Sequence, residues 1–259
     1  MHFSLLRKAS ILIVCLFGIP AILHSSEPND SVYGDISVMN YVTGRFSQIK
    51  SEMFVKLTDL KIPCNHDGHY LRKEAAESLK KMIDAFKKEN PNAPVWITSS
   101  TRTFFDQKYI WEAKWNGQTK VDGKKLNETD KDPLIRSRII LKYSSMPGTS
   151  RHHWGTDFDF NVLTDNYFAT GAGKPLYTWL VANASKYGFH QPYPGGRDKG
   201  YNEEKWHWSY TPLSKIFLKD WNRLHSSMDF TKGQNSFAGA ASAWHLADEY
   251  VNSINKDCK

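Results

Sequence analysis

The chain has 259 residues and a mass of 29.8 kDa, with 40% hydrophobic and 24% charged residues. Aromatic residues make up 14% of it, which excludes intrinsic disorder for most of the chain and supplies the apolar surface for one globular domain. The formal net charge of +7 is mild for this length, and it is more typical of a solvated surface than of a nucleic-acid groove.

The N-terminal residues have the pattern of a secretory signal. Arg7 and Lys8 precede an uncharged apolar run at 11–23. Because a membrane-spanning helix needs about 20 apolar residues, this run predicts a signal peptide over 1–26, with an uncleaved leader as the alternative. We therefore expect an exported protein of the periplasm or cell envelope whose single domain covers 27–259.

Two cysteines, Cys64 and Cys258, remain after removal of the signal peptide. In an oxidising compartment an even pair is a candidate disulfide, and two free thiols are the alternative. Neither cysteine belongs to a Cys-x-x-Cys pair, which excludes a cysteine-rich metal site.

The first predicted elements follow a stretch, 27–70, that has no clear periodicity. From Leu71 the apolar residues recur at spacings of three and four, which predicts an amphipathic helix over 71–90. Residues 94–99 are apolar and β-rich, and they read as a short buried strand. Thr103, followed three residues later by an acidic residue, predicts the start of a helix over 104–115.

Later elements continue this alternation of helices and strands. In chain order we expect a surface loop over 118–131, a helix over 132–142 capped by Asp132, a strand over 155–160, a helix over 175–187 closed by Gly188, a strand over 206–210, and helices over 214–223 and 236–254. Helices fall mainly at the two ends and strands in the middle. This order predicts an α+β fold in which a small central antiparallel sheet is flanked by helices.

Two imidazole and carboxylate groupings stand out in the central region. His152 and Asp159 lie seven residues apart, and Glu204 and His207 form a second grouping downstream. Two histidines and one carboxylate are the ligand set of a catalytic zinc site that keeps its fourth position open. A further carboxylate, Glu204, can then act as a base that is not itself a ligand. From spacing alone, hydrogen-bonded structural roles are the alternative.

The combined pattern resembles the LAS metallopeptidases, the group that includes the D-Ala-D-Ala carboxypeptidases and dipeptidases. Their signature, Ser-x-His-x-x-Gly-x-Ala-x-Asp followed downstream by Glu-x-Trp-His, is similar to SRHHWGTDFD at 150–159 and to EKWH at 204–207. A further element, an Arg followed five residues later by Gln, is matched by Arg102 and Gln107. The resemblance covers residues 38–215.

The resemblance implies a role for each matched polar residue. These roles are zinc ligand for His152, Asp159 and His207, general base for Glu204, oxyanion or carboxylate binding for Arg102, and substrate positioning for Gln107 and Ser150. It also implies one zinc ion per chain, bound at the central sheet, and hydrolysis of peptidoglycan stem peptides by removal of a terminal D-Ala.

Other functions stay open at this stage. An endopeptidase or dipeptidase acting on the same peptides is the nearest alternative, followed by a non-catalytic zinc-containing module of the cell wall. A basic binder of glycan or nucleic acid would use Trp111, Trp115, Trp179 and Trp208, although core packing is the expected role of these residues. We expect a monomer that binds peptidoglycan stem peptides and no nucleic acid.

Three features depart from the family pattern or from regular geometry. Asp157 stands where the family has a small apolar residue, and it shares a strand face with Asp159, so it either competes for the metal or orients a ligand imidazole. His153 is interpreted as a surface residue or as a support for its neighbours. Glu204 and His207 are an odd number of residues apart, so a turn or bulge must separate them if both reach the metal.

Overall fold

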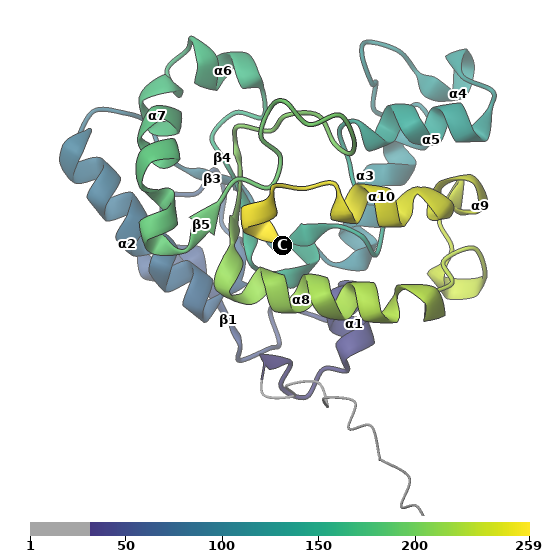
Figure 1. Ribbon diagram of the computed structural model, residues 1–259, viewed down its shortest axis with the longest axis horizontal. Coiled ribbons are helices and arrows are strands. Elements are labelled where there is room, and N and C mark those ends of the chain that lie inside the picture. The colour runs from purple at the N-terminus through teal and green to yellow at the C-terminus, as the bar shows by residue number, and fades with distance from the viewer. Residues whose placement is uncertain (1–31) are drawn as a thin grey trace, which may run out of the picture.

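The computed structural model describes residues 32–259, so the predicted signal peptide over 1–26 lies outside the described residues. Within 32–259 the chain forms two small antiparallel sheets surrounded by helices, which confirms the predicted α+β class (Figure 1). Among the described helices, none is long and apolar enough to cross a membrane.

The central sheet has four strands in the order β3-β4-β6-β5, and each neighbouring pair is antiparallel. The strands are β3 (Ile97–Ser99), β4 (Asp157–Phe160), β5 (Phe189–His190) and β6 (His207–Tyr210), and a separate sheet pairs β1 (Phe54–Lys56) with β2 (Tyr70–Arg72). The strands predicted over 155–160 and 206–210 correspond to β4 and β6. The strand predicted over 94–99 begins only at Ile97.

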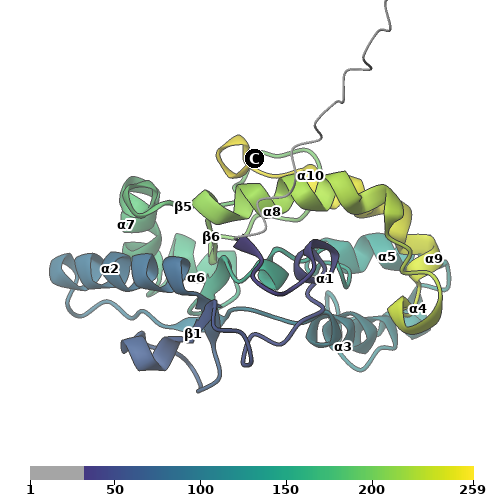
Figure 2. The same cartoon turned by 90° about the horizontal axis from the view of Figure 1, so that it is seen from below.

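Helices cover the central sheet on both sides. The α-helices of the described residues are α1 (Val38–Val42), α2 (Lys73–Glu89), α3 (Phe104–Trp115), α4 (Leu126–Thr129), α5 (Pro133–Leu141), α6 (Asp165–Ala169), α7 (Lys174–Asn183), α8 (Thr211–Leu224), α9 (Ala240–Ala243) and α10 (Ala247–Asn252). Figure 1 shows α2 and α7 on one side of the central strands and α3, α5 and α9 on the other, and Figure 2 shows the same division from below.

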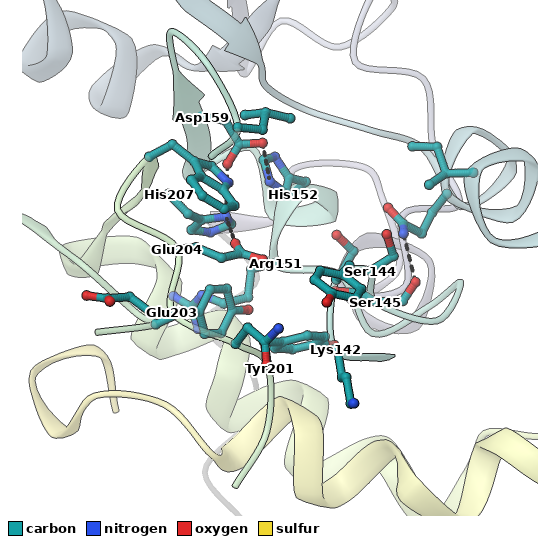
Figure 3. Close-up of a pocket in the computed structure, with 18 of the residues that line it drawn as sticks. Lys142, Ser144, Ser145, Arg151, His152, Asp159, Tyr201, Glu203, Glu204 and His207 are labelled. Carbon is teal, nitrogen blue, oxygen red and sulfur yellow. Dashed lines mark hydrogen bonds and ion pairs between the residues drawn. The ribbon is translucent and has the colours of Figure 1, made fainter. Parts of the chain in front are cut away.

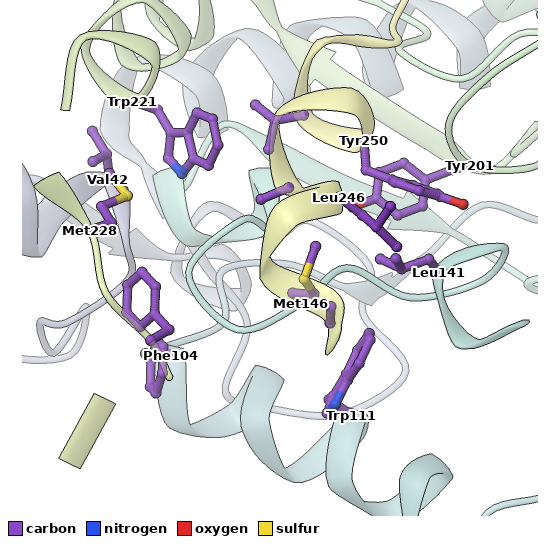
Figure 4. Close-up of a cluster of buried hydrophobic side chains, with 14 of the residues drawn as sticks. Val42, Phe104, Trp111, Leu141, Met146, Tyr201, Trp221, Met228, Leu246 and Tyr250 are labelled. Carbon is purple, nitrogen blue, oxygen red and sulfur yellow. The ribbon is translucent and has the colours of Figure 1, made fainter. Parts of the chain in front are cut away.

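Two hydrophobic cores match this division. One contains Trp111 and Trp221 together with apolar residues of α3, α5, α8, α9 and α10 (Figure 4). The other packs α2 and α7 against the central sheet and includes Phe158 of β4 and Trp208 of β6. Because neighbouring residues of a strand point to opposite faces, burying these two aromatic residues leaves the odd-numbered residues of β4 and β6 on the other face.

Local capping explains where two of the well-predicted helices, α3 and α5, begin. The helix predicted over 71–90 is α2, and the helix predicted over 104–115 is α3 with the same bounds. At α3 the Thr103 hydroxyl accepts from the Asp106 backbone N–H while the Asp106 carboxylate accepts from that of Thr103. At α5 the Asp132 carboxylate accepts from two backbone N–H groups of the first turn.

Three segments differ from their predicted structure. The helix predicted over 175–187 ends as α7 at Asn183, and a 3-10 turn over Ala184–Tyr187 follows it. The loop predicted over 118–131 contains the short helix α4. The single helix predicted over 236–254 is broken into α9, a 3-10 turn at Trp244–Leu246 and α10. Gly239 precedes α9 in the left-handed region at φ +78°, and it lies so close to Trp115 that a Cβ would be 2.2 Å from the indole ring. Packing of this backbone against the ring therefore sets the helix start.

The two cysteines are both free thiols, so the candidate disulfide is not formed. Cys64 is half-buried beside Ile97 of β3, whereas Cys258 is fully buried near the C-terminus. Burial raises the pKa of Cys64 to about 11 and that of Cys258 to about 12. Both thiols therefore stay protonated and unreactive near neutral pH.

Gly155 connects the turn Arg151–Trp154 to β4 in a left-handed conformation at φ +71°, and an added Cβ would lie 2.3 Å from Phe54 Cε1. Gly155→Ala is expected to lower the free energy of unfolding by about 2 kcal/mol or more, because backbone strain adds to steric overlap. Denaturant unfolding measures this loss. Gly123→Ala is the control, because Gly123 has φ +76° with nothing within 4 Å, and it should lose about 1 kcal/mol. Equal losses would contradict a packing role for Gly155.

Candidate active site

Three side chains with metal-binding atoms meet at the central sheet. Asp159 of β4 lies directly opposite His207 of β6, and His152 comes from the turn that precedes β4. His152 Nε2 lies 3.3 Å from Asp159 Oδ2, and His207 Nδ1 lies 3.1 Å from Asp159 Oδ1 (Figure 3). One potential ligand atom from each of the three buried side chains lies within 4.8 Å of the others.

The second nitrogen of each imidazole is fixed by a partner that can only accept a hydrogen bond. His152 Nδ1 donates to the carbonyl oxygen of Ser100 at 2.9 Å, and His207 Nε2 donates to the carboxylate of Asp157 at 3.0 Å. In the neutral rings His152 Nε2 and His207 Nδ1 therefore have free lone pairs that face Asp159.

These atoms fit a tetrahedral zinc ion. Zinc bonds to nitrogen and oxygen of about 2.0–2.1 Å keep ligand atoms roughly 3.3 Å apart, close to the separations observed here. Asp159 Oδ1 is buried without a hydrogen-bond partner among the described residues, as expected of an oxygen atom that binds a cation. Two nitrogens and one oxygen also match the ligand types of catalytic zinc sites.

The electrostatics of the three residues agree with this fit. Burial raises the pKa of Asp159, but the neighbouring imidazoles outweigh it and hold that pKa well below its usual value. Burial and the nearby charge of Arg102 lower the pKa of His152, which favours the neutral ring. Burial also lowers the pKa of His207, yet its hydrogen bond to Asp157 and the nearby carboxylate of Asp159 prevail and raise it to about 9. Without a cation, a proton on His207 compensates the carboxylates.

Asp157 lies behind His207 and contacts it from the far side of the ring. Its Oδ2 accepts from His207 Nε2 and also from Arg151 Nε at 2.9 Å, and Ser209 donates to its Oδ1. Arg151 and Asp157 are 2% and 0% exposed, so this is a fully buried ion pair. Of the two interpretations of Asp157, the geometry favours orientation of the His207 imidazole.

Asp157→Ala is expected to weaken zinc binding by about 10-fold to 100-fold, because His207 loses the acceptor that fixes its ring. The same change leaves Arg151 buried without its carboxylate and should lower stability by about 3–5 kcal/mol. Competition with a chromogenic chelator measures zinc affinity. Ser209→Ala is the control, since Ser209 contacts both members of the ion pair but not the imidazole. Zinc affinity in Asp157→Ala equal to that of the control would contradict the orienting role.

Glu204 reaches the same site from a turn that precedes β6. The His207 N–H donates to the Glu204 carbonyl at 3.3 Å, so a turn separates the two residues, as their odd spacing requires. Glu204 Oε2 lies 3.4 Å from His207 Nδ1. Burial raises the pKa of Glu204 to about 7, and the positive charge of His207 opposes this only in part. The backbone is fixed by Tyr193, whose carbonyl accepts from the Glu204 N–H, and by Gln191, whose amide donates to the Glu204 carbonyl.

A cavity of about 570 Å³ opens beside these residues, and every residue with a predicted site role lines it. Three of them, Arg102, Gln107 and Ser150, present buried polar atoms without a hydrogen-bond partner among the described residues: Nε, Oε1 and Oγ respectively. Buried polar groups are normally paired, so these three are candidates to bind a substrate that enters the cavity.

Of the two interpretations of His153, the surface position is wrong, and the support of neighbouring residues agrees with its contacts. Its ring is completely buried, with Nδ1 donating to the carbonyl of Arg102 at 2.8 Å and Nε2 accepting from the backbone N–H of Gly148 at 3.0 Å. The Arg102 N–H donates to the carbonyl of His152. His153 therefore fixes the backbone of Arg102 beside the metal-binding residues.

Sequence reasoning did not find three further cations that line the cavity, Lys114, Lys142 and Arg151. Arg151 lies within the segment 150–159 that resembles the family signature. The presence of Asp157, an acidic residue on a predicted buried strand, could have indicated that a cation such as Arg151 is buried beside it. Lys114 lies seven residues after Gln107 on α3, a spacing that places both on one helix face.

The tryptophans named for a glycan or nucleic-acid binder belong to the hydrophobic cores. Trp111, Trp179 and Trp208 are buried, and Trp115 packs partly buried against the first core. Buried rings cannot stack on a ligand at the surface, so core packing is confirmed as their role.

One family model and several known proteins match parts of this chain. A family model described as VanY, D-alanyl-D-alanine carboxypeptidase, matches residues 68–213. YodJ of Bacillus subtilis (strain 168), which is named as a carboxypeptidase, is 31% identical to this chain over 149 residues. The match covers 54% of this chain and 46% of YodJ. A D-alanyl-D-alanine carboxypeptidase of Enterococcus faecalis (strain ATCC 700802 / V583) is 30% identical over 118 residues, or 45% of this chain and 37% of that protein.

The chain thus matches less than half the length of each of these curated relatives. Among solved structures, the LdcB LD-carboxypeptidase is similar with a TM-score of 0.49 and 24% identity, over 70% of this chain and 76% of that chain.

Proposed function

Because the chain belongs to the VanY family of D-alanyl-D-alanine carboxypeptidases, we propose that it is a zinc-dependent peptidase that removes the terminal D-Ala from peptidoglycan stem peptides. The observation that supports this most directly is the convergence of His152, Asp159 and His207 with the non-ligand carboxylate of Glu204 at the wall of one cavity. A site with three protein ligands, an adjacent base and room for a peptide has the parts that hydrolysis requires.

In this proposal His152 Nε2, Asp159 and His207 Nδ1 hold one zinc ion per chain. Zinc bound there supplies Lewis acidity, which polarises the scissile carbonyl and lowers the pKa of the attacking water. Asp157 and the Ser100 carbonyl keep the two imidazoles in the tautomers that ligation needs.

Glu204 acts as the general base and then as the general acid. Its carboxylate takes a proton from the attacking water as the new bond from oxygen to the carbonyl carbon forms. When the bond between that carbon and the D-Ala nitrogen breaks, Glu204 returns the proton to the leaving amine. Burial favours this role, because it brings the pKa of Glu204 to about 7 and lets the carboxyl group exchange protons near neutral pH.

Arg102, Gln107 and Ser150 bind and orient the substrate. The Arg102 guanidinium is a fixed positive charge with forked donors, and it suits either the developing oxyanion or a substrate carboxylate. Gln107 donates its amide to the Ser145 carbonyl at 2.7 Å, which fixes the side chain and leaves Oε1 to accept from the peptide. Ser150 can donate its free hydroxyl to a carbonyl oxygen.

The setting of the activity is part of the proposal. Residues 1–26 would export the chain to the periplasm or cell envelope, where peptidoglycan is found, and 27–259 would form a monomeric peptidase domain. N-terminal sequencing of the exported protein and its mass in solution test both statements.

The function is tested by incubating the zinc-loaded protein with a stem pentapeptide that ends in D-Ala-D-Ala. Release of free D-Ala, abolished by a chelator and restored by zinc, is the expected result. Release of the intact D-Ala-D-Ala dipeptide, or cleavage nearer the N-terminus of the peptide, would contradict carboxypeptidase activity. Either result would favour the endopeptidase or dipeptidase alternative. No cleavage of any stem peptide by the zinc-loaded protein would overturn the proposal.

A further inference from the structure

The cavity extends from the metal-binding residues along one face of α3. Gln107, Ile110 and Lys114 line it at spacings of three and four residues, so they form a continuous stripe of the helix. Lys114 is half-buried, and its amino group donates to the hydroxyl of Ser144, which lines the cavity as well. The proposed function does not use this lysine.

Both Lys114 and Arg102 lack an acidic partner. Among the described residues no carboxylate oxygen lies within 4.0 Å of either cation. By contrast Lys108, on the same helix, lies 3.8 Å from Glu112 and donates to the Ser236 carbonyl. The nearest acidic side chains of the cavity, Asp159 and Glu204, are already in contact with His207.

The two unpaired cations are close enough to interact. Burial and the positive charge of Arg102 together lower the pKa of Lys114 to about 8, and the negative charge of Glu204 opposes them only in part. Asp159 and Glu204 compensate these two charges only from beyond 4.0 Å, and an anion that enters between the cations would remove much of the cost of burying two like charges. This end of the cavity therefore has the properties of an anion site.

The opposite wall favours the same orientation of an anionic ligand. Asp165 and Glu203 line the cavity there, and Lys205 lies 3.7 Å from Asp165 and 2.5 Å from Glu203. Lys205 and Arg197 offset the charges of these two carboxylates, so this wall has no unpaired cation to offer a carboxylate of the ligand. An acidic group of a bound peptide is therefore directed to the wall formed by α3.

We propose that Lys114 is a second carboxylate-binding residue, and that Lys114 and Arg102 together hold the free C-terminal carboxylate of the substrate peptide. This inference rests on the proposed function and makes it more specific. A peptide whose C-terminus is extended or amidated has no charge to offer the two cations, so the site selects chain ends over internal peptide bonds. Lys114 would thereby favour carboxypeptidase activity over endopeptidase activity.

The test compares two ligands and two lysines in zinc-loaded protein. A Glu204→Gln background prevents turnover, and calorimetry measures the binding of a stem pentapeptide ending in D-Ala-D-Ala as the free acid and as the C-terminal amide. Lys114→Met is expected to weaken binding of the acid roughly tenfold to a hundredfold, because one charged contact is lost, and to change binding of the amide less than about threefold. Lys114→Arg should keep most of the preference for the acid.

Lys108→Met is the matched control, since Lys108 is on the same helix but has its own acidic partner. It should leave the affinity for both peptides unchanged. An acid-to-amide affinity ratio in Lys114→Met equal to that of the background would overturn the inference, while release of D-Ala by the wild-type protein would leave the proposed function intact. Failure of the zinc-loaded protein to bind either peptide would overturn both.

Discussion

Glu204→Gln is expected to lower kcat for D-Ala release by about 10²-fold to 10⁴-fold, the range that a positioned general base contributes. Glutamine keeps the shape of the side chain but cannot take a proton from the attacking water. Zinc content should not change, because Glu204 is not one of the three ligands. Steady-state kinetics with the stem pentapeptide, together with elemental analysis of the same preparation, measure both quantities.

Glu203→Gln provides the matched control for this variant. Glu203 is the adjacent residue and lines the same cavity, but it is paired with Lys205 and is farther from the metal-binding residues in the arrangement of Figure 3. It should retain kcat within a few fold. Full activity of Glu204→Gln would show that Glu204 is not the general base. The position of this carboxylate beside the metal-binding residues would then have no catalytic explanation.

Replacing His207 by alanine should abolish stable zinc binding. His207 contributes one of three potential ligand atoms, so its loss must cost more than the roughly 100-fold that follows when only a supporting contact is removed. Elemental analysis of the mature wild-type protein should find about one zinc per chain, and the His207→Ala variant should contain little after dialysis. D-Ala release should fall with the zinc content.

His190→Ala is the control for the histidine variant, because His190 lies on the neighbouring strand β5 with its side chain 28% exposed. It should bind zinc like the wild type. Thermal unfolding in the presence of a chelator separates a loss of ligation from a loss of folding. A wild-type protein that contains no zinc and takes up none on reconstitution would contradict the metallopeptidase function.

Several parts of the fold could be predicted because their causes are local in the chain. The start of α3 follows from Thr103 and Asp106, whose side chains form a capping box within the first four residues of the helix. The start of α5 follows in the same way from Asp132. The alternation in 157–160 likewise determined that Asp157 and Asp159 share a face of β4.

The site residues were predicted from spacing and from a family resemblance, and the structure brings all of them to one cavity. Their catalytic and binding roles stay a proposal, whereas their proximity is observed in the structure. The pairing of β4 with β6 joins Asp159 to His207 across 47 intervening positions, and local patterns do not specify such a contact. Only the match of several blocks in order made the prediction possible.

The sequence by itself determined which chemical groups are present, which of them share a helix or strand face, and where locally capped helices begin. Only the tertiary structure decided that Asp157 faces the far side of His207, that His153 is buried behind Arg102, and that Lys114 reaches the cavity without an acidic partner among the described residues. The physical reason is that burial and ion pairing depend on residues distant in the chain, whereas capping and periodicity depend on neighbours within a few positions.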